Sequence, residues 1–161
     1  MPIQFYFKFV EVIKIKLIGA VMILCACACA CAFYEKGEKN KIFHLASCYD
    51  YIRYIKTQIE YFSMPIDAIH SSYEPKSELC DALIANEGID KLFEKEDATL
   101  ISGFFSSLGK GMKNEELSLC SYTIEELEKR IERKKADYPN KIKVFRATAL
   151  FIGFCTIILL I

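Results

Sequence analysis

The chain has 161 residues, with 21 basic and 21 acidic side chains and a formal net charge of zero. That length accommodates one compact domain and little more, and the charge balance argues against nucleic-acid binding, which usually needs a basic excess. Hydrophobic residues make up 53% of the chain and charged residues 26%. The apolar residues are concentrated at both ends, which excludes an ordinary soluble enzyme as the default class.

Residues 1–16 form an N-terminal extension ahead of the first apolar block. Apolar and polar side chains alternate from Ile3 to Phe9, a period of two that is typical of a strand. A lone strand beside a membrane helix has no partner, so we expect an interfacial segment or a helical extension of the span that follows. The third alternative is an upstream start codon chosen in error.

Residues 17–34 are predicted to form a first transmembrane helix. The run from Leu17 to Phe33 carries no charge, and as a helix it would be ~26 Å long, close to the ~30 Å hydrocarbon core of a bilayer. Tyr34 adds an aromatic side chain suited to the membrane interface.

Four cysteines alternate with alanine in this span, at positions Cys25, Cys27, Cys29 and Cys31. On a helix, Cys25 and Cys29 share one side and the other two share the opposite side, so the four thiolates cannot converge on one metal without a second chain. We interpret them as small apolar residues that allow close helix packing. A membrane protein that binds a metal or does thiol chemistry with these cysteines is one alternative. A lipoprotein is another, since Leu24-Cys25-Ala26-Cys27 is similar to a cleavage box with Cys27 lipidated.

Residues 35–143 are predicted to form an all-α domain, a bundle of five or six short helices, because apolar residues recur there at helical spacing and no strand pattern competes. A first helix covers residues 41–62, and Pro65 opens a second one that ends at Ser72. Ser77 is expected to cap a third helix over residues 78–87. Three buried cysteines are predicted in this domain, namely Cys48, Cys80 and Cys120.

The second half of this domain carries further capping signals. Residues 89–95 are predicted to form a short helical turn, and Asp97 is expected to cap a helix over residues 98–108. The predicted turn and cap positions that follow are Leu108, Gly109, Gly111 and Asn114, with the glycines closing one helix in the left-handed conformation and the asparagine opening the next.

The last helix of the domain is densely charged. Pairs four residues apart, Glu125 with Lys129 and Glu126 with Arg130, would support it. Its charged face is a candidate partner surface, weighed against the commoner role of a solvated helix face; its residues are Glu125, Glu126, Glu128, Lys129, Arg130, Glu132 and Arg133. Pro139 is expected to kink or interrupt this helix.

Residues 144–161 are predicted to form the second transmembrane helix. No charge occurs from Ala147 to Ile161, and Arg146 can extend its guanidinium to the surface so that Val144 and Phe145 also lie in lipid.

Basic residues flank both spans on the side of the middle domain. Residues 35–146 hold 14 lysines and 4 arginines, and positively charged loops stay in the cytoplasm. We therefore predict a multi-pass protein of the cell membrane with a cytoplasmic middle domain and both termini at the outer side. Lys8, Lys14 and Lys16 also favour the inside, but the middle domain outweighs them by count.

The sequence contains no arrangement of residues that predicts catalysis. His44 and Cys48 are four residues apart, but two ligands do not make a metal site, and His70 has no ligand at metal-binding spacing. We therefore expect no enzyme activity, no cofactor and no metal.

Short motifs in a fixed order carry a family resemblance. They are Lys16 to Val21 in the first span, Ile59 to Ile66 at a helix end, the step Leu108-Gly109, and Phe151 to Phe154 in the second span. With this layout the chain resembles the stage III sporulation protein AB family over residues 15–161.

The resemblance implies a non-enzymatic scaffold in the channel complex that links mother cell and forespore. Its place would be the mother-cell membrane facing the forespore, with a helical domain similar to those of type II secretion platform proteins. The implied partners are a cytoplasmic ATPase, stage III sporulation protein AA, other membrane proteins of the channel and the lipid bilayer. No nucleic acid is implied, and a homo-oligomer is compatible with this arrangement.

Overall fold

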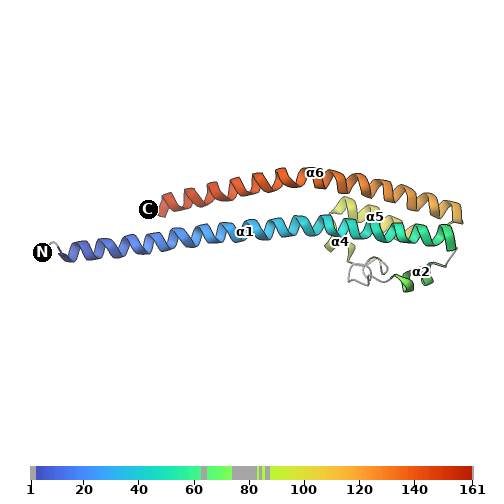
Figure 1. Cartoon of the computed structure of the whole chain (residues 1–161), viewed down its shortest axis with the longest axis horizontal. Helices are drawn as coiled ribbons and strands as arrows, with labels where there is room; N and C mark the ends of the chain where they lie inside the picture. Colours follow the sequence, from blue (N-terminus) through green and yellow to red (C-terminus); the bar gives the residue numbers. More distant parts are fainter. Residues whose placement is uncertain (1–2, 63–64, 74–82, 84, 86–87, 161) are drawn as a thin grey trace. The chain divides into compact units, whose positions relative to one another are not determined.

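The computed structural model describes residues 3–62, 65–73, 83, 85 and 88–160. Within these ranges the chain is helical and has no strand, so the all-α prediction is confirmed (Figure 1). The elements in chain order are α1 (Ile3–Thr57), the π-helical turn η1 (Gln58–Phe62), α2 (Ile66–Ser72), α4 (Ile89–Leu92), α5 (Lys95–Ser107) and α6 (Lys113–Leu160).

The helix α1 is continuous over 55 residues. It joins the N-terminal extension, the first apolar block and the first predicted helix of the middle domain, so the alternating residues near the N-terminus belong to a helical extension and not to a strand. Its two glycines, Gly19 and Gly37, each carry a helix cost of about 1 kcal/mol relative to alanine. Five residues of π-helix end the element before Pro65, which is the N-cap of α2.

The short elements between the long helices agree in part with those predicted from the sequence. α2 matches the predicted helix from Pro65 to Ser72. The predicted third helix, with Ser77 and Cys80, lies outside the described residues apart from Leu83 and Ala85, of which Leu83 is buried. α4 begins after Gly88, whose φ of 73° is in the left-handed region that glycine adopts without strain.

The helix α6 runs unbroken from Lys113 to Leu160 with Pro139 inside it. Of the two predicted effects of this proline, a kink or an interruption, the interruption is therefore wrong. Proline removes one backbone hydrogen bond and crowds the preceding turn, at a cost of about 3 kcal/mol. Helix-forming residues on both sides, together with the packing of each half against other helices, outweigh that local cost.

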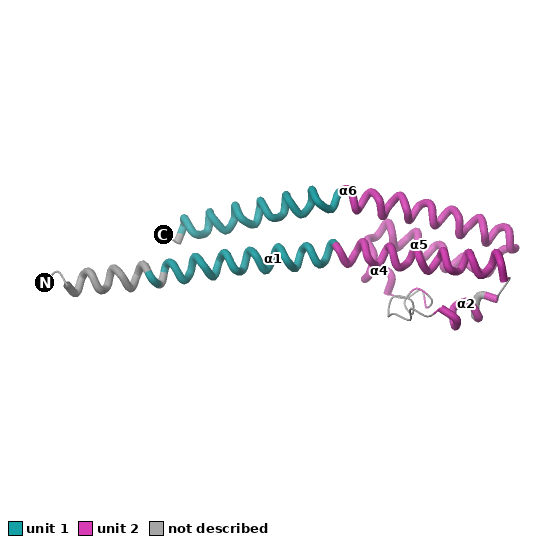
Figure 2. The backbone as a smooth tube through the Cα atoms, in the orientation of Figure 1, with its two compact units in different colours: residues 1–38, 137–161 teal, residues 39–136 magenta. Residues whose placement is uncertain are grey.

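The chain divides into two compact units, coloured separately in Figure 2. Unit 1 comprises residues 1–38 and 137–161, and unit 2 comprises residues 39–136. In unit 1 the segments of α1 and α6 lie side by side (Figure 2). There the rings of Tyr34 and Phe145 stack at 4.0 Å, and a Cβ atom on Gly153 would lie 3.1 Å from the Cys27 sulfur, so the glycine allows the two helices to approach closely.

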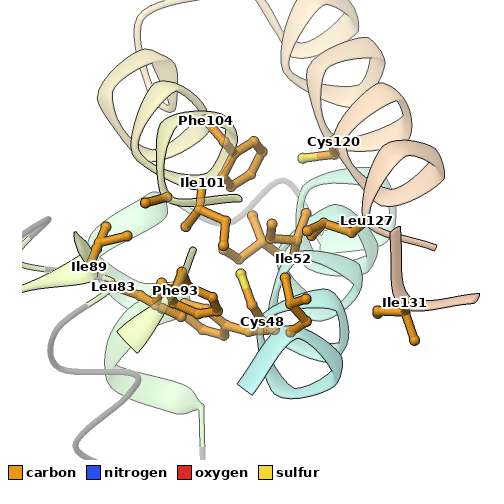
Figure 3. Close-up of a cluster of buried hydrophobic side chains, with 14 of the residues drawn as sticks. Cys48, Ile52, Leu83, Ile89, Phe93, Ile101, Phe104, Cys120, Leu127 and Ile131 are labelled. Carbon is orange, nitrogen blue, oxygen red and sulfur yellow. The ribbon is translucent and has the colours of Figure 1, made fainter. Parts of the chain in front are cut away.

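Unit 2 is built around a single apolar core. Ile52 of α1, Ile101 and Phe104 of α5 and Leu127 of α6 converge in it (Figure 3). Cys48 and Cys120 are also fully buried, as predicted. Tyr51 is the largest fully buried side chain, and its ring packs against Tyr73 and Phe105. The core thus joins the helical stripe of α1 to α5 and α6.

The turn between α5 and α6 is held by carboxylates of the following helix. Gly109 has a φ of 86°, which confirms its left-handed conformation. The backbone N–H groups of Gly109 and Gly111 both donate to Glu116 Oε1 at 2.9 Å. A Cβ atom on Gly111 would lie 2.9 Å from Glu115 Oε2, so Gly111 is explained by this close approach and not by a left-handed backbone. Leu108 is the C-cap of α5.

The prediction that Asn114 caps the last helix is wrong, because α6 begins one residue earlier, at Lys113. Instead, the N–H of Met112 donates to Glu115 Oε2 at 2.9 Å. This is the backward contact of a capping box, in which a carboxylate at the third helical position accepts the N–H that precedes the helix.

We expect the Glu116→Ala variant to lose about 2 kcal/mol in the free energy of unfolding, because two backbone N–H groups lose a charged acceptor. Glu116→Gln keeps an acceptor oxygen and should lose about half as much. Chemical denaturation of the full chain in detergent, followed by circular dichroism, measures both. A loss below ~0.5 kcal/mol for the alanine variant, the usual size for a surface change, would contradict this role.

Candidate functional site

Two helices of unit 2 are joined by ion pairs around Asp97. This residue lies in the first turn of α5 and is 3% exposed. Arg130 Nη1 of α6 donates to Asp97 Oδ1 at 2.8 Å, and Lys134 Nζ lies 3.1 Å from Asp97 Oδ2. The prediction that Asp97 is an N-cap is wrong, since α5 begins at Lys95. The carboxylate is instead a buried link between α5 and α6.

Glu94, at the start of α5, extends the same network. Lys134 donates to Glu94 Oε2, and Lys41 of α1 lies 3.3 Å from its Oε1. The hydrogen bond from Lys134 lowers the pKa of Glu94 below its ordinary value of 4.5, against the opposing effect of partial burial, and Lys41 adds to the lowering. For Lys134, burial acts to lower the pKa, but hydrogen bonds to Glu94 and Asp97 outweigh it and the pKa is raised. The three helices are therefore fixed together by alternating charges.

This network predicts a loss of stability in acid. A carboxylate with a lowered pKa in the folded state contributes stability above its unfolded value, and that contribution disappears as the pH falls through the folded pKa. We expect the wild-type chain to be more stable than Glu94→Gln at neutral pH, and the difference to shrink toward zero below about pH 4.5. Unfolding curves of both proteins across this range measure it; a difference that does not change with pH would contradict the assignment.

The predicted charged face of α6 is divided by the fold into two groups. Glu125 and Lys129 pair at 2.8 Å and are both more than half exposed, as expected for a solvated helix pair. Arg130 does not pair with Glu126 as predicted: it donates to Asp97, and Glu126 lies 3.4 Å from Lys129. The members that remain exposed on α6 are Glu125, Glu128, Lys129, Glu132 and Arg133.

A surface groove of about 290 Å³ adjoins this face, between α1 and α6 within unit 2. α6 contributes two of the exposed carboxylates, Glu128 and Glu132, together with Lys135. α1 contributes Tyr49 and Asp50. Ala46 and Ile131 add apolar surface to the groove. Charged side chains beside apolar ones suit a protein contact in which the charges set specificity and association rate.

Unit 1 exposes its apolar side chains. Two segments are long and apolar enough to cross a membrane by length and composition, with a mean hydropathy of 2.4 in α1 and 1.9 in α6. Met22, Phe33, Phe151 and Leu159 are more than two-thirds exposed. Contiguous apolar surface of this extent is rare on soluble monomers and marks a membrane or protein contact. It indicates association with a membrane.

Within the described ranges, no three histidine, cysteine, aspartate or glutamate side chains lie close enough together to hold a metal ion. Along the cysteine run, Cys25 and Cys29 are exposed while Cys27 and Cys31 are half-buried. Burial raises the pKa of the Cys120 thiol to about 11, with the neighbouring Glu116 adding to the shift. His70 Nδ1 bonds to the Tyr51 hydroxyl, and His44 Nδ1 is buried without a protein partner in the part of the chain described.

Sequence reasoning missed the Glu94–Asp97–Lys134 network. Its only signal is an acidic first turn on one helix and two cations four residues apart, Arg130 and Lys134, on another. Such patterns are common, and only the packing of α5 against α6 brings these charges together.

Among protein families, the model described as stage III sporulation protein AB matches residues 73–161, more than half of the chain. No curated protein matches, and no solved structure matches.

Proposed function

Because the chain belongs to the stage III sporulation protein AB family, and so to the proteins of sporulation, we propose that it is a non-enzymatic membrane scaffold of the channel complex between mother cell and forespore. Both apolar segments cross the mother-cell membrane, and the middle unit lies in the cytoplasm. The described residues supply exposed apolar surface for the membrane and a charged surface for a partner.

The observation that carries the proposal is the continuity of α6. One helix bears the exposed charged face around Glu128 and Glu132 and, further along, an apolar segment that is exposed as far as Leu159. Successive turns of this helix are hydrogen-bonded to one another, apart from the one backbone bond that Pro139 removes. We infer that a partner bound at the charged face is coupled to the membrane segment through the continuous backbone of α6.

We propose that this partner is the cytoplasmic ATPase of the complex, stage III sporulation protein AA. The groove with Tyr49, Asp50, Glu128, Glu132 and Lys135 is its docking surface. The support is electrostatic: three carboxylates and one ammonium give the groove an acidic excess, which favours a basic surface on the partner.

The test is capture of the purified ATPase by the tagged full chain in detergent. The Glu128→Lys/Glu132→Lys variant should reduce capture about tenfold or more, since like charges brought together at an interface cost several kcal/mol. Glu96→Lys, an exposed reversal on α5, is the matched control and should capture normally. Equal capture by all three proteins would refute the docking surface, and no capture by the wild type would refute the partner.

A further inference from the structure

Unit 1 contains a second groove, of about 340 Å³, between its two apolar helix segments. Leu24, Ala28 and Ala32 of α1 form one wall, and Ala149 and Leu150 of α6 form the other. Alanines and half-buried cysteines leave space between the helices because their side chains are short. This volume is in the range of pockets that hold a drug-sized ligand, ~300–1,000 Å³.

One end of the groove is charged. Glu35 and Arg146 line it there, with Arg146 Nη2 donating to Glu35 Oε2 at 2.6 Å. This contact uses one of the five N–H groups of the guanidinium, and the arginine side chain is 57% exposed. The polar end of the groove therefore holds a cation whose remaining N–H groups can donate to a further anionic oxygen.

The charge around this end is positive. The two helix segments nearest to it, residues 35–38 and 141–146, together carry four cations and two carboxylates, which gives a net charge of +2. They are Lys36, Lys141, Lys143 and Arg146 against Glu35 and Glu38, of which Glu38 lies 3.8 Å from Lys141. Basic sites at the cytoplasmic ends of transmembrane helices attract anionic lipid headgroups.

The length of the groove matches one leaflet. Leu24 and Glu35 are separated by eleven positions, or about 16 Å along a helix, which is about half the ~30 Å hydrocarbon thickness. An acyl chain that starts at a headgroup beside Arg146 would follow the alanine wall toward the middle of the bilayer. A helix from a second copy would bring apolar side chains but no anion for the guanidinium.

We propose that this groove binds one anionic glycerophospholipid, with an acyl chain along the wall from Leu24 to Ala32 and its phosphate at Arg146. The inference rests on the proposed membrane location of unit 1. The lipid fills the space that short side chains leave between the two helices. The bound lipid thereby holds Glu35 and Arg146, at the charged end of the groove, at the depth of the lipid headgroups.

Native mass spectrometry of the full chain in detergent tests the site. The protein is titrated with phosphatidylglycerol and with phosphatidylcholine of identical acyl chains. We expect one phosphatidylglycerol to bind about fivefold or more tightly than phosphatidylcholine, as expected for a basic residue near an anionic group. Equal binding of the two lipids overturns the proposal.

Two matched variants separate headgroup binding from closure of the helix pair, because both remove the ion pair between Glu35 and Arg146. Arg146→Gln should remove the preference for phosphatidylglycerol, whereas Glu35→Gln should retain or increase it. If both variants lose the preference equally, the pair serves only to close the hairpin and the proposal fails. Inorganic phosphate, which lacks acyl chains, should not displace the lipid. Displacement by phosphate would overturn the proposal that an acyl chain lies along the wall from Leu24 to Ala32.

A third variant tests the apolar wall. Ala28→Leu/Ala32→Leu fills the groove and should abolish binding of both lipids without changing the oligomeric state of the chain. A dimer mass that replaces the lipid in the wild type would assign the groove to a second copy and refute the proposal. Carbonate extraction of membranes distinguishes this outcome from a failure of the proposed location, because a chain released by carbonate has no membrane segment to test.

Discussion

Replacing Asp97 with alanine is expected to lower the free energy of unfolding by about 3 kcal/mol, since Arg130 loses its buried carboxylate partner and Lys134 keeps only its pairing with Glu94. The affected charges are the guanidinium of Arg130 and the ammonium of Lys134, at 2.8 and 3.1 Å from the carboxylate. Both retain some contact with water, which places the expected loss at the lower end of the range for such pairs. Chemical denaturation of the full chain in detergent measures the loss.

The control is Glu125→Gln on the same charged helix. It breaks the pair between Glu125 and Lys129, whose side chains are 67% and 57% exposed, and ion pairs so open to solvent contribute little to stability. Asp97→Asn keeps the shape of the side chain and should still be clearly destabilised, because the amide supplies no charge. Equal free energies of unfolding for Asp97→Ala and Glu125→Gln would show that the ion pairs of Asp97 between α5 and α6 do not stabilise the fold.

The second large effect is expected at Tyr51. Its side chain is fully buried, its ring contacts Tyr73 and Phe105, and its hydroxyl bonds to His70. Tyr51→Ala removes an aromatic ring that joins α1 to α2 and α5, and should cost about 4 kcal/mol, as is usual for a large aromatic residue in a packed core. Urea denaturation is the measurement.

Tyr51→Phe is the matched variant. It keeps the ring and removes only the hydroxyl bonded to His70, so it should cost about 1 kcal/mol. A large loss for phenylalanine and no further loss for alanine would show that the hydrogen bond, and not the packing of the ring, stabilises the core.

Helical periodicity was sufficient to predict the all-α class and much of the core. Apolar residues at helical spacing were predicted to form a stripe from Ile42 to Phe62. Its members that are buried in α1 and η1 are Leu45, Ile52, Ile55 and Ile59, because helix spacing and burial follow the same period, whereas Phe62 at its end is 65% exposed. The turn at Gly109 was also predictable, since a left-handed backbone requires a residue without a side-chain penalty.

Helix boundaries and charge partners were less predictable, for physical reasons. A capping side chain contributes only about 1 kcal/mol, so Asp97 and Asn114 are placed inside helices when tertiary contacts favour a start one or two residues earlier. Pro139 is tolerated in the same way. The partner of Arg130 is Asp97, 33 residues away, and local spacing favoured Glu126 because sequence carries no information on which helices pack together.

For a scaffold, these features have a common consequence. The ion pairs around Glu94 and Asp97 hold α1, α5 and α6 together near the charged face of α6. In the proposed scaffold, a bundle stabilised in this way would resist unfolding when the proposed ATPase partner acts on it. Variants that loosen the network, such as Asp97→Ala, are therefore expected to impair sporulation even where the groove residues are unchanged.

The most direct test of the membrane scaffold is the position of the turn at Lys110 relative to the bilayer. A protease site inserted there should be cut in sealed inverted vesicles and protected in sealed spheroplasts, and a separate carbonate extraction should leave the chain in the membrane fraction. Release of the chain by carbonate, or cleavage from the outside of intact spheroplasts, would contradict a membrane protein whose charged helical unit faces a cytoplasmic partner.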